Sequence, residues 1–400
     1  MSIHQAAFVY ADTAASPVFM KNIFVENPES AEIEITGLGF FELRVGGKKV
    51  SEDLLVPPVS DYSERDLSTL YYPISDRFSH RVYYCRYSLA EYLEHGNNTI
   101  EIQLGDGWYR QDVRTGEGKL SFGKPRLAFS LTVDGREYLS DETLFWRDSE
   151  IVRQNLYIGE AHDFRHKDRE WKPASLIEAP TGTLYESDAP HDKIIRKIRP
   201  AVIFRDGTRT VYDAGINLSG VVGFTQNAKP DEETIVLHAE RIHEDMTLFV
   251  RSAGELPQKD TYISDGEPHF CMPKFVFHGF RYFEITGPAE DVWVYEIHSD
   301  IPVRAKFHSD HKVLNFLYTA SLRSLYSNMH SAVISDCPHR ERLGYTGDGQ
   351  LTANVVMTCF DAESMYRKWI RDIADCQDIF NGHVQHTAPF YGGGGGPGGW

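Results

Sequence analysis

The chain has 400 residues, and at about 100 to 200 residues per domain this length predicts two to four domains with packed cores. Lys and Arg number 41 against 58 Asp and Glu, so the formal charge of −17 repels phosphate backbones and anionic membrane surfaces. We therefore expect no nucleic-acid partner and no membrane partner, and no apolar run approaches the roughly 18 residues that span a bilayer.

Cysteine usage and the first residues bear on the compartment. The five cysteines are odd in number and scattered, without the close C-x-x-C pairs of zinc or redox sites. A reducing compartment is the simpler interpretation, and the first residues lack the apolar stretch of a secretion signal. We predict a cytoplasmic protein with no cofactor and no metal site, although a cation in the β regions stays open. The oligomeric state is open too, with a homodimer among the alternatives.

In the first third of the chain, apolar residues recur with period two, the pattern of strands with one buried face. The segments 31–35 and 41–45 both alternate apolar with charged residues, and Gly46-Gly47 then supplies a two-residue hairpin turn. We expect an antiparallel β-sandwich in residues 1–200. Its last part, residues 151–200, is rich in charge and is interpreted as an irregular crossing segment.

A second β-rich region spans residues 201–302. Its segments 234–240 and 275–285 are dense in β-branched and aromatic residues, and repeated short strands and turns again predict a sandwich. After Ile301-Pro302 the apolar period changes from 2 to 3.6, which marks the start of a helical region.

Residues 303–400 carry three helical patterns. Apolar residues at three- and four-residue steps over 313–329 predict an amphipathic helix with an N-cap at Ser309-Asp310. Further patterns occupy 349–360 and the segment after Asp361. Three helices with wide apolar faces cannot close a core by themselves, and a glycine-rich stretch precedes the final Trp. We therefore expect the helical domain to be incomplete here.

The densest polar cluster is SDCPHRERLGYTGDGQ, between two predicted helices. Glu341 stands there between Asp336 and Asp348, and neighbouring carboxylates raise the pKa of a carboxylic acid, so that it can serve as a general acid. Arg340 and Arg342 would oppose that shift if they paired with Glu341, so pairing with the aspartates or with ligand oxygens suits this chemistry better. A solvated, salt-bridged loop is the alternative interpretation.

The stretch DCPHRERLGYTGD resembles the signature of the bacterial α-L-rhamnosidases, glycoside hydrolase family 78. Upstream, TGLGFFELRVGGKKV and LGDGWY resemble the N-terminal β-sandwich of that family, and YDAGINLSG, HAE and FHGFRYFEITG resemble its lectin-like β-sandwich. The resemblance covers residues 20–400. It implies two N-terminal antiparallel β-sandwiches, in residues 1–200 and 201–302, followed by the first helices of an (α/α)6 catalytic barrel in residues 303–400.

The resemblance also implies an activity, the inverting removal of terminal non-reducing α-L-rhamnose from rhamnosides. Glu341 matches the general acid of the family, which protonates the leaving oxygen. Asp336, Arg340 and Asp348 match residues that hold the sugar hydroxyls. Inversion needs a second carboxylate roughly 6.5 to 9.5 Å away to activate water, and we expect this base glutamate beyond residue 400.

Two aromatic residues complete the implied sugar pocket. Tyr345 stands where many family members carry Trp, which keeps an aromatic wall for the sugar, and Trp400 falls where the family places an aromatic at the pocket. Many relatives have one more acidic residue between the positions of Arg340 and Glu341, so the shorter spacing here is interpreted as a subgroup variant.

Other residues are weaker candidates. Cys337 beside His339 is too close in sequence for an aligned thiol and imidazole. His383 and His386 have a metal-like spacing but no evident third ligand. The dipeptide Trp108-Tyr109 is more simply a core element than a sugar-stacking surface. Two further functions stay open: a non-catalytic carbohydrate-binding protein, and an (α/α)6-barrel hydrolase for a different sugar.

Overall fold

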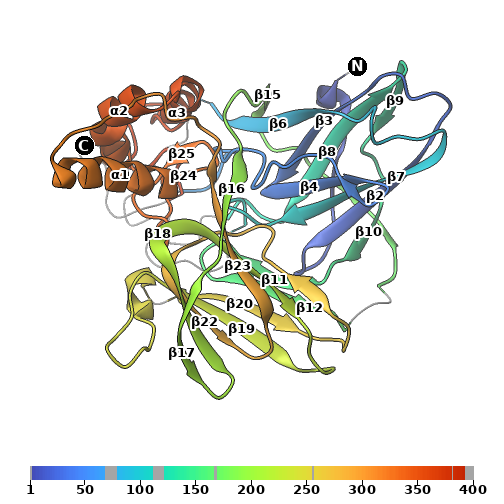
Figure 1. Cartoon of the computed structure of the whole chain (residues 1–400). Coiled ribbons are helices and arrows are strands. Elements are labelled where there is room, and N and C mark those ends of the chain that lie inside the picture. Colours follow the sequence, from blue (N-terminus) through green and yellow to red (C-terminus); the bar gives the residue numbers. More distant parts are fainter. Residues whose placement is uncertain are drawn as a thin grey trace.

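A computed structural model of the chain describes residues 2–67, 79–110, 121–165, 169–254, 256–380 and 382–391 (Figure 1). Trp400 and the preceding glycines lie outside these residues, so the expectation for Trp400 stays a prediction. Within the described ranges, no helix is both long and apolar enough to cross a membrane.

The N-terminal part contains two sheets that enclose a common apolar core. The first sheet has the order β14-β1-β8-β3-β6-β15, with β9 beside β8. Its strands are β1 (Phe8–Tyr10), β3 (Ala31–Leu38), β6 (Arg81–Ser88), β8 (Arg126–Val133), β9 (Arg136–Leu139), β14 (Ser175–Ile177) and β15 (Thr183–Glu186). The second sheet contains β2 (Pro17–Val25), β4 (Phe40–Val45), β5 (Lys48–Lys49), β7 (Gly96–Gly105), β10 (Phe145–Asp148) and β13 (Lys172–Pro173).

The alternating patterns of the sequence account for this sandwich. Ile33 and Ile35 of β3 are fully buried, while Glu32 and Glu34 alternate with them on the other face, where Glu32 is exposed and Glu34 is half-buried. Strands β4 and β5 form the predicted hairpin, whose turn residues Gly46 and Gly47 have φ of 55° and 77°. Trp108 is 4% exposed, in agreement with the core interpretation.

The second β region forms one continuous ten-stranded sheet around its own core. The long strand β18 pairs with four other strands, so the sheet has a sandwich-like arrangement (Figure 1). The strands are β11 (Ile151–Asn155), β12 (Gly159–Asp163), β16 (Asp192–Ile198), β17 (Ala201–Asp206), β18 (Arg209–Gln226), β19 (Glu233–Ala239), β20 (Gln258–Ile263), β21 (His269–Cys271), β22 (His278–Thr286) and β23 (Glu290–Ser299).

The interpretation of residues 151–200 as irregular was wrong. Strands β11, β12 and β16 belong to the ten-stranded sheet, and β13, β14 and β15 extend the two N-terminal sheets. The sequence of β12 shows no apolar alternation, because the buried positions of this strand hold polar residues that form hydrogen bonds. Glu160, fully buried, accepts bonds from the backbone N–H groups of Phe275 (2.7 Å) and Lys274 (3.0 Å).

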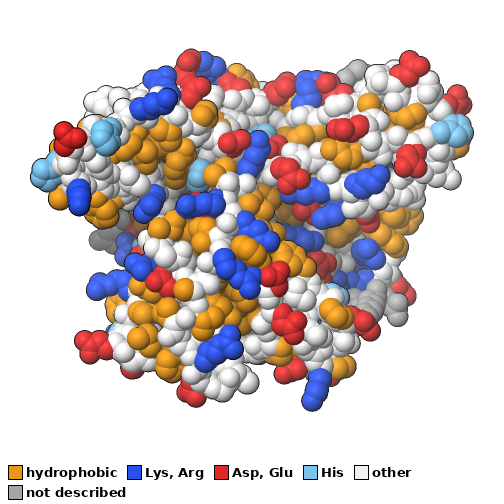
Figure 2. Space-filling model, viewed as in Figure 1, with side chains coloured by type: hydrophobic (Ala, Val, Ile, Leu, Met, Phe, Trp, Pro, Cys, Tyr) orange, Lys and Arg blue, Asp and Glu red, His pale blue; other side chains and the backbone are white. Residues whose placement is uncertain are grey.

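The helical part contains α1 (Lys312–Ser327), α2 (Thr346–Cys359) and α3 (Glu363–Asp375), with a short hairpin of β24 (Met329–His330) and β25 (Val333–Ile334) after α1. The predicted N-cap of α1 was wrong: the cap residue is His311, and the Ser309 hydroxyl accepts a bond from its N–H at 3.1 Å. Apolar side chains of α1 and α2 are exposed, among them Phe316 (67%) and Leu351 (74%). Figure 2 shows hydrophobic side chains on the surface of this part, at the upper left.

A buried carboxylate joins the helical part to the ten-stranded sheet. Asp192, 1% exposed, accepts hydrogen bonds from the Ser299 hydroxyl (2.8 Å), the Ser331 N–H (3.0 Å) and His330 Nδ1 (2.7 Å). Ser331 and His330 lie in the β24–β25 hairpin, directly before the polar cluster found in the sequence. This contact therefore fixes where that cluster begins.

A second polar contact joins the N-terminal sandwich to the segment before β16. His191 Nδ1 lies 2.9 Å from Asp53 Oδ2, and its Nε2 lies 3.8 Å from Cys85 Sγ. Burial by itself raises the pKa of Asp53, but the bond and charge of His191 outweigh it and lower this pKa to about 2. Burial by itself lowers the pKa of His191, but Cys85 and Asp53 raise it to about 10.

Candidate active site

The polar cluster, residues 335–350, follows β25 and includes the first turn of α2; it is called the motif loop below. It lies directly on strand β22. A Cβ atom at Gly279 would come within 2.9 Å of Pro338 Cγ and 3.0 Å of His339 Cβ, so only glycine allows this approach. The ten-stranded sheet therefore acts as the support of the motif loop.

Arg342 anchors the motif loop to this support. The side chain is 2% exposed, and its guanidinium donates hydrogen bonds to the Leu156 carbonyl and to Gln258 Oε1, the latter at 3.0 Å. It also lies over the Phe277 ring, 4.5 Å from the ring centroid. Burial lowers the pKa of Arg342 to about 10. Arg342 thus points away from the aspartates of the motif loop, unlike the arrangement that the sequence favoured.

Glu341 is held on the solvent side of the same loop, with 23% of its side chain exposed. Arg340 donates to its Oε1, and the Tyr345 hydroxyl donates to its Oε2. The pairing of Arg340 with Glu341 is the one that the sequence argument disfavoured. It occurs because the two neighbours share the exposed side of the loop, where Arg340 is 49% exposed.

Asp336 and Cys337 lie beneath Glu341. The Asp336 carboxylate accepts bonds from the Leu343 N–H (3.3 Å) and from Cys337 Sγ (3.0 Å), and Cys337 Sγ accepts a bond from the Glu341 N–H (3.3 Å). Burial, with a smaller contribution from the charge of Glu341, raises the pKa of the Asp336 carboxyl. Burial and Asp336 raise the pKa of the Cys337 thiol to about 11, which disfavours a nucleophilic thiol.

The remaining site candidates lie at the start of α2. Tyr345 precedes the helix, and Asp348 lies half-buried in its first turn, with no side-chain hydrogen bond to any residue within the described ranges. The segment 385–388 runs alongside: Thr346 N–H donates to the His386 carbonyl at 2.7 Å. The structure thus brings Asp336, Arg340, Glu341, Tyr345 and Asp348 together on one loop and its following helix turn.

Comparison with known proteins matches three family models in succession. Residues 26–206 match the α-L-rhamnosidase N-terminal domain, and residues 204–301 match the bacterial α-L-rhamnosidase concanavalin-like domain. Residues 303–400, which include the motif loop, match the bacterial α-L-rhamnosidase 6 hairpin glycosidase domain.

The chain belongs to the bacterial α-L-rhamnosidase family. It is 26% identical to an α-L-rhamnosidase of Formosa agariphila, over 91% of this chain and 40% of that protein. Among solved structures, the α-L-rhamnosidase of Dictyoglumus thermophilum is 26% identical with a TM-score of 0.86, covering 96% of this chain and 46% of that one. A Streptomyces avermitilis α-L-rhamnosidase, solved with L-rhamnose, shares the fold with a TM-score of 0.85 at 24% identity, over 95% of this chain and 38% of that one. The chain thus spans less than half the length of these relatives.

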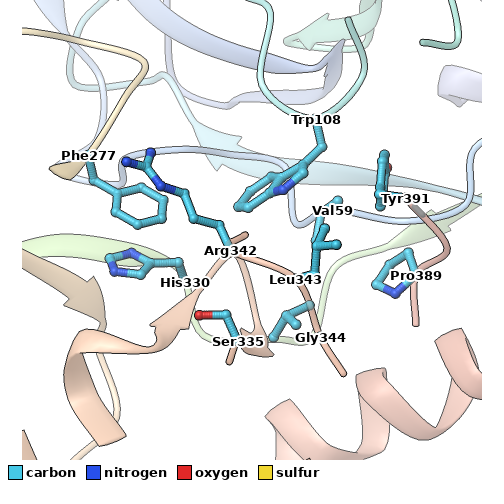
Figure 3. Close-up of a pocket in the computed structure, with 11 residues that line it drawn as sticks. Val59, Trp108, Phe277, His330, Ser335, Arg342, Leu343, Gly344, Pro389 and Tyr391 are labelled. Carbon is cyan, nitrogen blue, oxygen red and sulfur yellow. The ribbon is translucent and has the colours of Figure 1, made fainter. Parts of the chain in front are cut away.

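A small cavity in this rhamnosidase-family chain lies behind the motif loop, at the junction of its three parts (Figure 3). Trp108, Phe277, His330, Arg342 and Tyr391 contribute to its walls. Its volume of about 10 Å³ is roughly the space that one water molecule needs, so it is too small for a sugar. In Figure 3, Arg342 extends between Phe277 and Trp108, which places this cavity on the anchoring side of the loop.

Sequence reasoning missed the residues that hold the motif loop. Gln258 receives the Arg342 bond and also exchanges hydrogen bonds with the Gly279 backbone, at 2.9 Å in both directions. Nothing near Gln258 in the sequence indicates this role, because its partners are 21 and 84 residues away. The hydroxyl of Tyr345 on Glu341 is the other contact that was missed, although the spacing of four residues would have allowed it.

Proposed function

We propose that this chain is part of an exo-acting α-L-rhamnosidase, an inverting glycoside hydrolase that removes terminal non-reducing α-L-rhamnose. The observation that carries the proposal is the succession of three α-L-rhamnosidase domain models from residue 26 to residue 400. The relatives named above are α-L-rhamnosidases, and one of them was solved with L-rhamnose.

Glu341 is the proposed general acid that protonates the leaving oxygen. Its carboxyl is partly exposed, and donors on both of its oxygens fix its orientation. The guanidinium of Arg340 has no acceptor, so a proton on Glu341 Oε1 would require Arg340 to move away. A proton on Oε2 requires no such movement, because the Tyr345 hydroxyl can rotate and accept a hydrogen bond from it. The second carboxylate, which activates water, is expected beyond residue 400.

The neighbouring side chains are proposed to hold the sugar. Asp348 has no side-chain hydrogen bond within the described part of the chain, so its carboxylate is available to sugar hydroxyls. Asp336 and Arg340 are proposed for the same role. Tyr345 is only 8% exposed, so we propose that it orients Glu341 in addition to forming one wall of the pocket.

We further propose that α1 to α3 begin an (α/α)6 barrel over residues 303–400, which follows the N-terminal sandwich and the ten-stranded sheet. The exposed apolar side chains of α1 and α2 support this proposal, because such a surface is normally covered by neighbouring helices. The boundary predicted at residue 200 is not kept, because β11, β12 and β16 precede it and belong to the ten-stranded sheet. A cytoplasmic location and a homodimer stay predictions of the sequence.

The test of the general acid is Glu341→Gln in the full-length protein, with Glu363→Gln as the matched control. Glu363 is 72% exposed on α3 and forms a surface pair with Arg367. We expect Glu341→Gln to lower kcat by about 10² to 10⁴ for a rhamnoside with a poor leaving group, and less for an aryl rhamnoside. Inversion is tested by proton NMR, which identifies the anomer of the sugar that is released first: an inverting enzyme releases the anomer opposite to that of the substrate.

If Glu341→Gln hydrolyses a rhamnoside with a poor leaving group at close to the wild-type rate, Glu341 is not the general acid. Calorimetric binding of a rhamnoside without turnover in the wild-type protein would instead favour the carbohydrate-binding alternative. Release of another sugar in preference to rhamnose would favour a different hydrolase of the same architecture.

A further inference from the structure

Three side chains with metal-binding groups meet in the interior of the ten-stranded sheet. They are His238 on β19, Asp260 on β20 and His278 at the start of β22, on strands that neighbour one another (Figure 1). Each is at most 1% exposed, and their ligand atoms all lie within 4.8 Å of one another. In the sheet register Gln258 lies opposite His238, so Asp260 is the diagonal neighbour of His238 on the same face.

The two imidazoles face one carboxylate oxygen. Asp260 Oδ2 lies 2.9 Å from His278 Nε2 and 4.0 Å from His238 Nε2, and the two rings stack with their centroids 4.1 Å apart. Among the described residues, His238 Nε2 has no hydrogen-bond partner. A buried nitrogen lone pair without a donor costs free energy, and a metal ion would accept that lone pair.

Two of the three groups, His238 and Asp260, have the outer contacts of metal ligands, whereas Nδ1 of His278 has no hydrogen-bond partner among the described residues. The other ring nitrogen of His238, Nδ1, lies 3.3 Å from the Gln258 carbonyl, and the second oxygen of Asp260 accepts the Glu160 N–H at 2.9 Å. Bonds of this kind fix the tautomer of a ligating histidine and the orientation of a ligating carboxylate. For His238 they leave Nε2, the atom that faces Asp260, as the acceptor.

A bound cation would offset the charge of the buried Asp260. The other charged or titratable groups around the cluster are Arg342, which is 2% exposed, and Glu160, whose Oε2 already lies 2.7 Å from Nε2 of the buried His162. Two imidazoles and one carboxylate are a ligand set typical of zinc and its divalent neighbours, whereas Mg²⁺ and Ca²⁺ prefer oxygen ligands.

We propose that His238, Asp260 and His278 bind a divalent transition metal ion of the Zn²⁺ class, which crosslinks β19, β20 and β22. The ion is structural, because its ligands are buried and lie apart from the solvent side of the motif loop. Gln258 connects the two regions: its carbonyl holds His238, and its side chain accepts the bond from Arg342. Metal binding would therefore stabilise the support on which the motif loop rests.

The experiment uses the full-length protein and does not depend on its catalytic activity. Metal content is measured by mass spectrometry of the native protein, and Tm is measured after chelation and again after addition of Zn²⁺. We expect close to one metal ion per chain, a lower Tm after chelation and its recovery with Zn²⁺. A double variant, His238→Gln with His278→Gln, should lose the bound metal and the response to Zn²⁺.

The matched control is His298→Gln, because His298 is also buried in this sheet, at 4% exposed, but lies outside the cluster. This variant should retain the metal. Absence of metal in the native protein, together with no change of Tm with Zn²⁺, Co²⁺ or Ni²⁺, would overturn the proposal and leave a hydrogen-bonded cluster with at most an internal water. If the double variant fails to fold, the visible spectrum of Co²⁺ added to the chelated wild-type protein decides: imidazole-ligated Co²⁺ supports the site, and the spectrum of aqueous Co²⁺ refutes it.

Discussion

Replacement of Asp192 by alanine tests whether the contact between the helical part and the ten-stranded sheet is as important as its burial suggests. The substitution removes the acceptor of three hydrogen bonds, from Ser299, Ser331 and His330, in a place that is 1% exposed. Each buried donor left without a partner costs about 1 to 3 kcal/mol. The Ser299 hydroxyl can rotate, whereas the Ser331 N–H is fixed by the backbone, so we expect a loss of about 4 kcal/mol rather than the full sum.

The assay is urea unfolding followed by tryptophan fluorescence, with the midpoint of the first transition as the measure. Asp192→Asn keeps one acceptor oxygen and should lose about 2 kcal/mol. Asp300→Ala is the control, because Asp300 is 51% exposed and pairs with Lys193 at the surface, a contact worth at most about 1 kcal/mol. The reasoning fails if Asp192→Ala shifts the midpoint no more than Asp300→Ala does.

Three further predictions concern titration, reactivity and packing. The folded pKa of His191, about 10, lies above its ordinary value of 6.5, so its stabilisation is complete below pH 6.5 and is lost as the pH rises to 10. At about 1.4 kcal/mol per pKa unit, the unfolding free energy of the wild type should fall by about 5 kcal/mol over this range, and an equally steep fall in His191→Gln would contradict the assignment. Alkylation of Cys337 at pH 8, followed by mass spectrometry, should be about two orders of magnitude slower than that of a free cysteine, because burial raises its pKa to about 11; a rate equal to that of a free thiol would contradict this. In Gly344→Ala the new Cβ would lie 2.6 Å from the Ala388 carbonyl oxygen, so a stability loss of about 3 kcal/mol is expected, and an unchanged Tm would show that the segment can move aside.

The sequence by itself determined the strands and helices whose pattern has a clear period. Alternation in β3 and β4 forces one face inward, and the three- and four-residue steps of α1 allow only a helix, so both were predicted close to their observed ends. Prediction from the sequence failed for β12, because a buried strand of polar residues has no alternation of apolar residues to detect. The residues of the candidate site were found because a motif keeps them adjacent in the chain, which requires no knowledge of the fold.

Only the tertiary structure decided what adjacent residues do. Arg340 and Arg342 are the same residue type two positions apart, yet one pairs with Glu341 at the surface and the other is buried against Gln258. Arg342 adopts a φ of 54°, and this left-handed turn directs the backbone so that the two guanidiniums lie on opposite sides of the loop. The cluster of His238, Asp260 and His278 is likewise invisible in the sequence, because strand pairing alone brings together residues 18 to 40 positions apart.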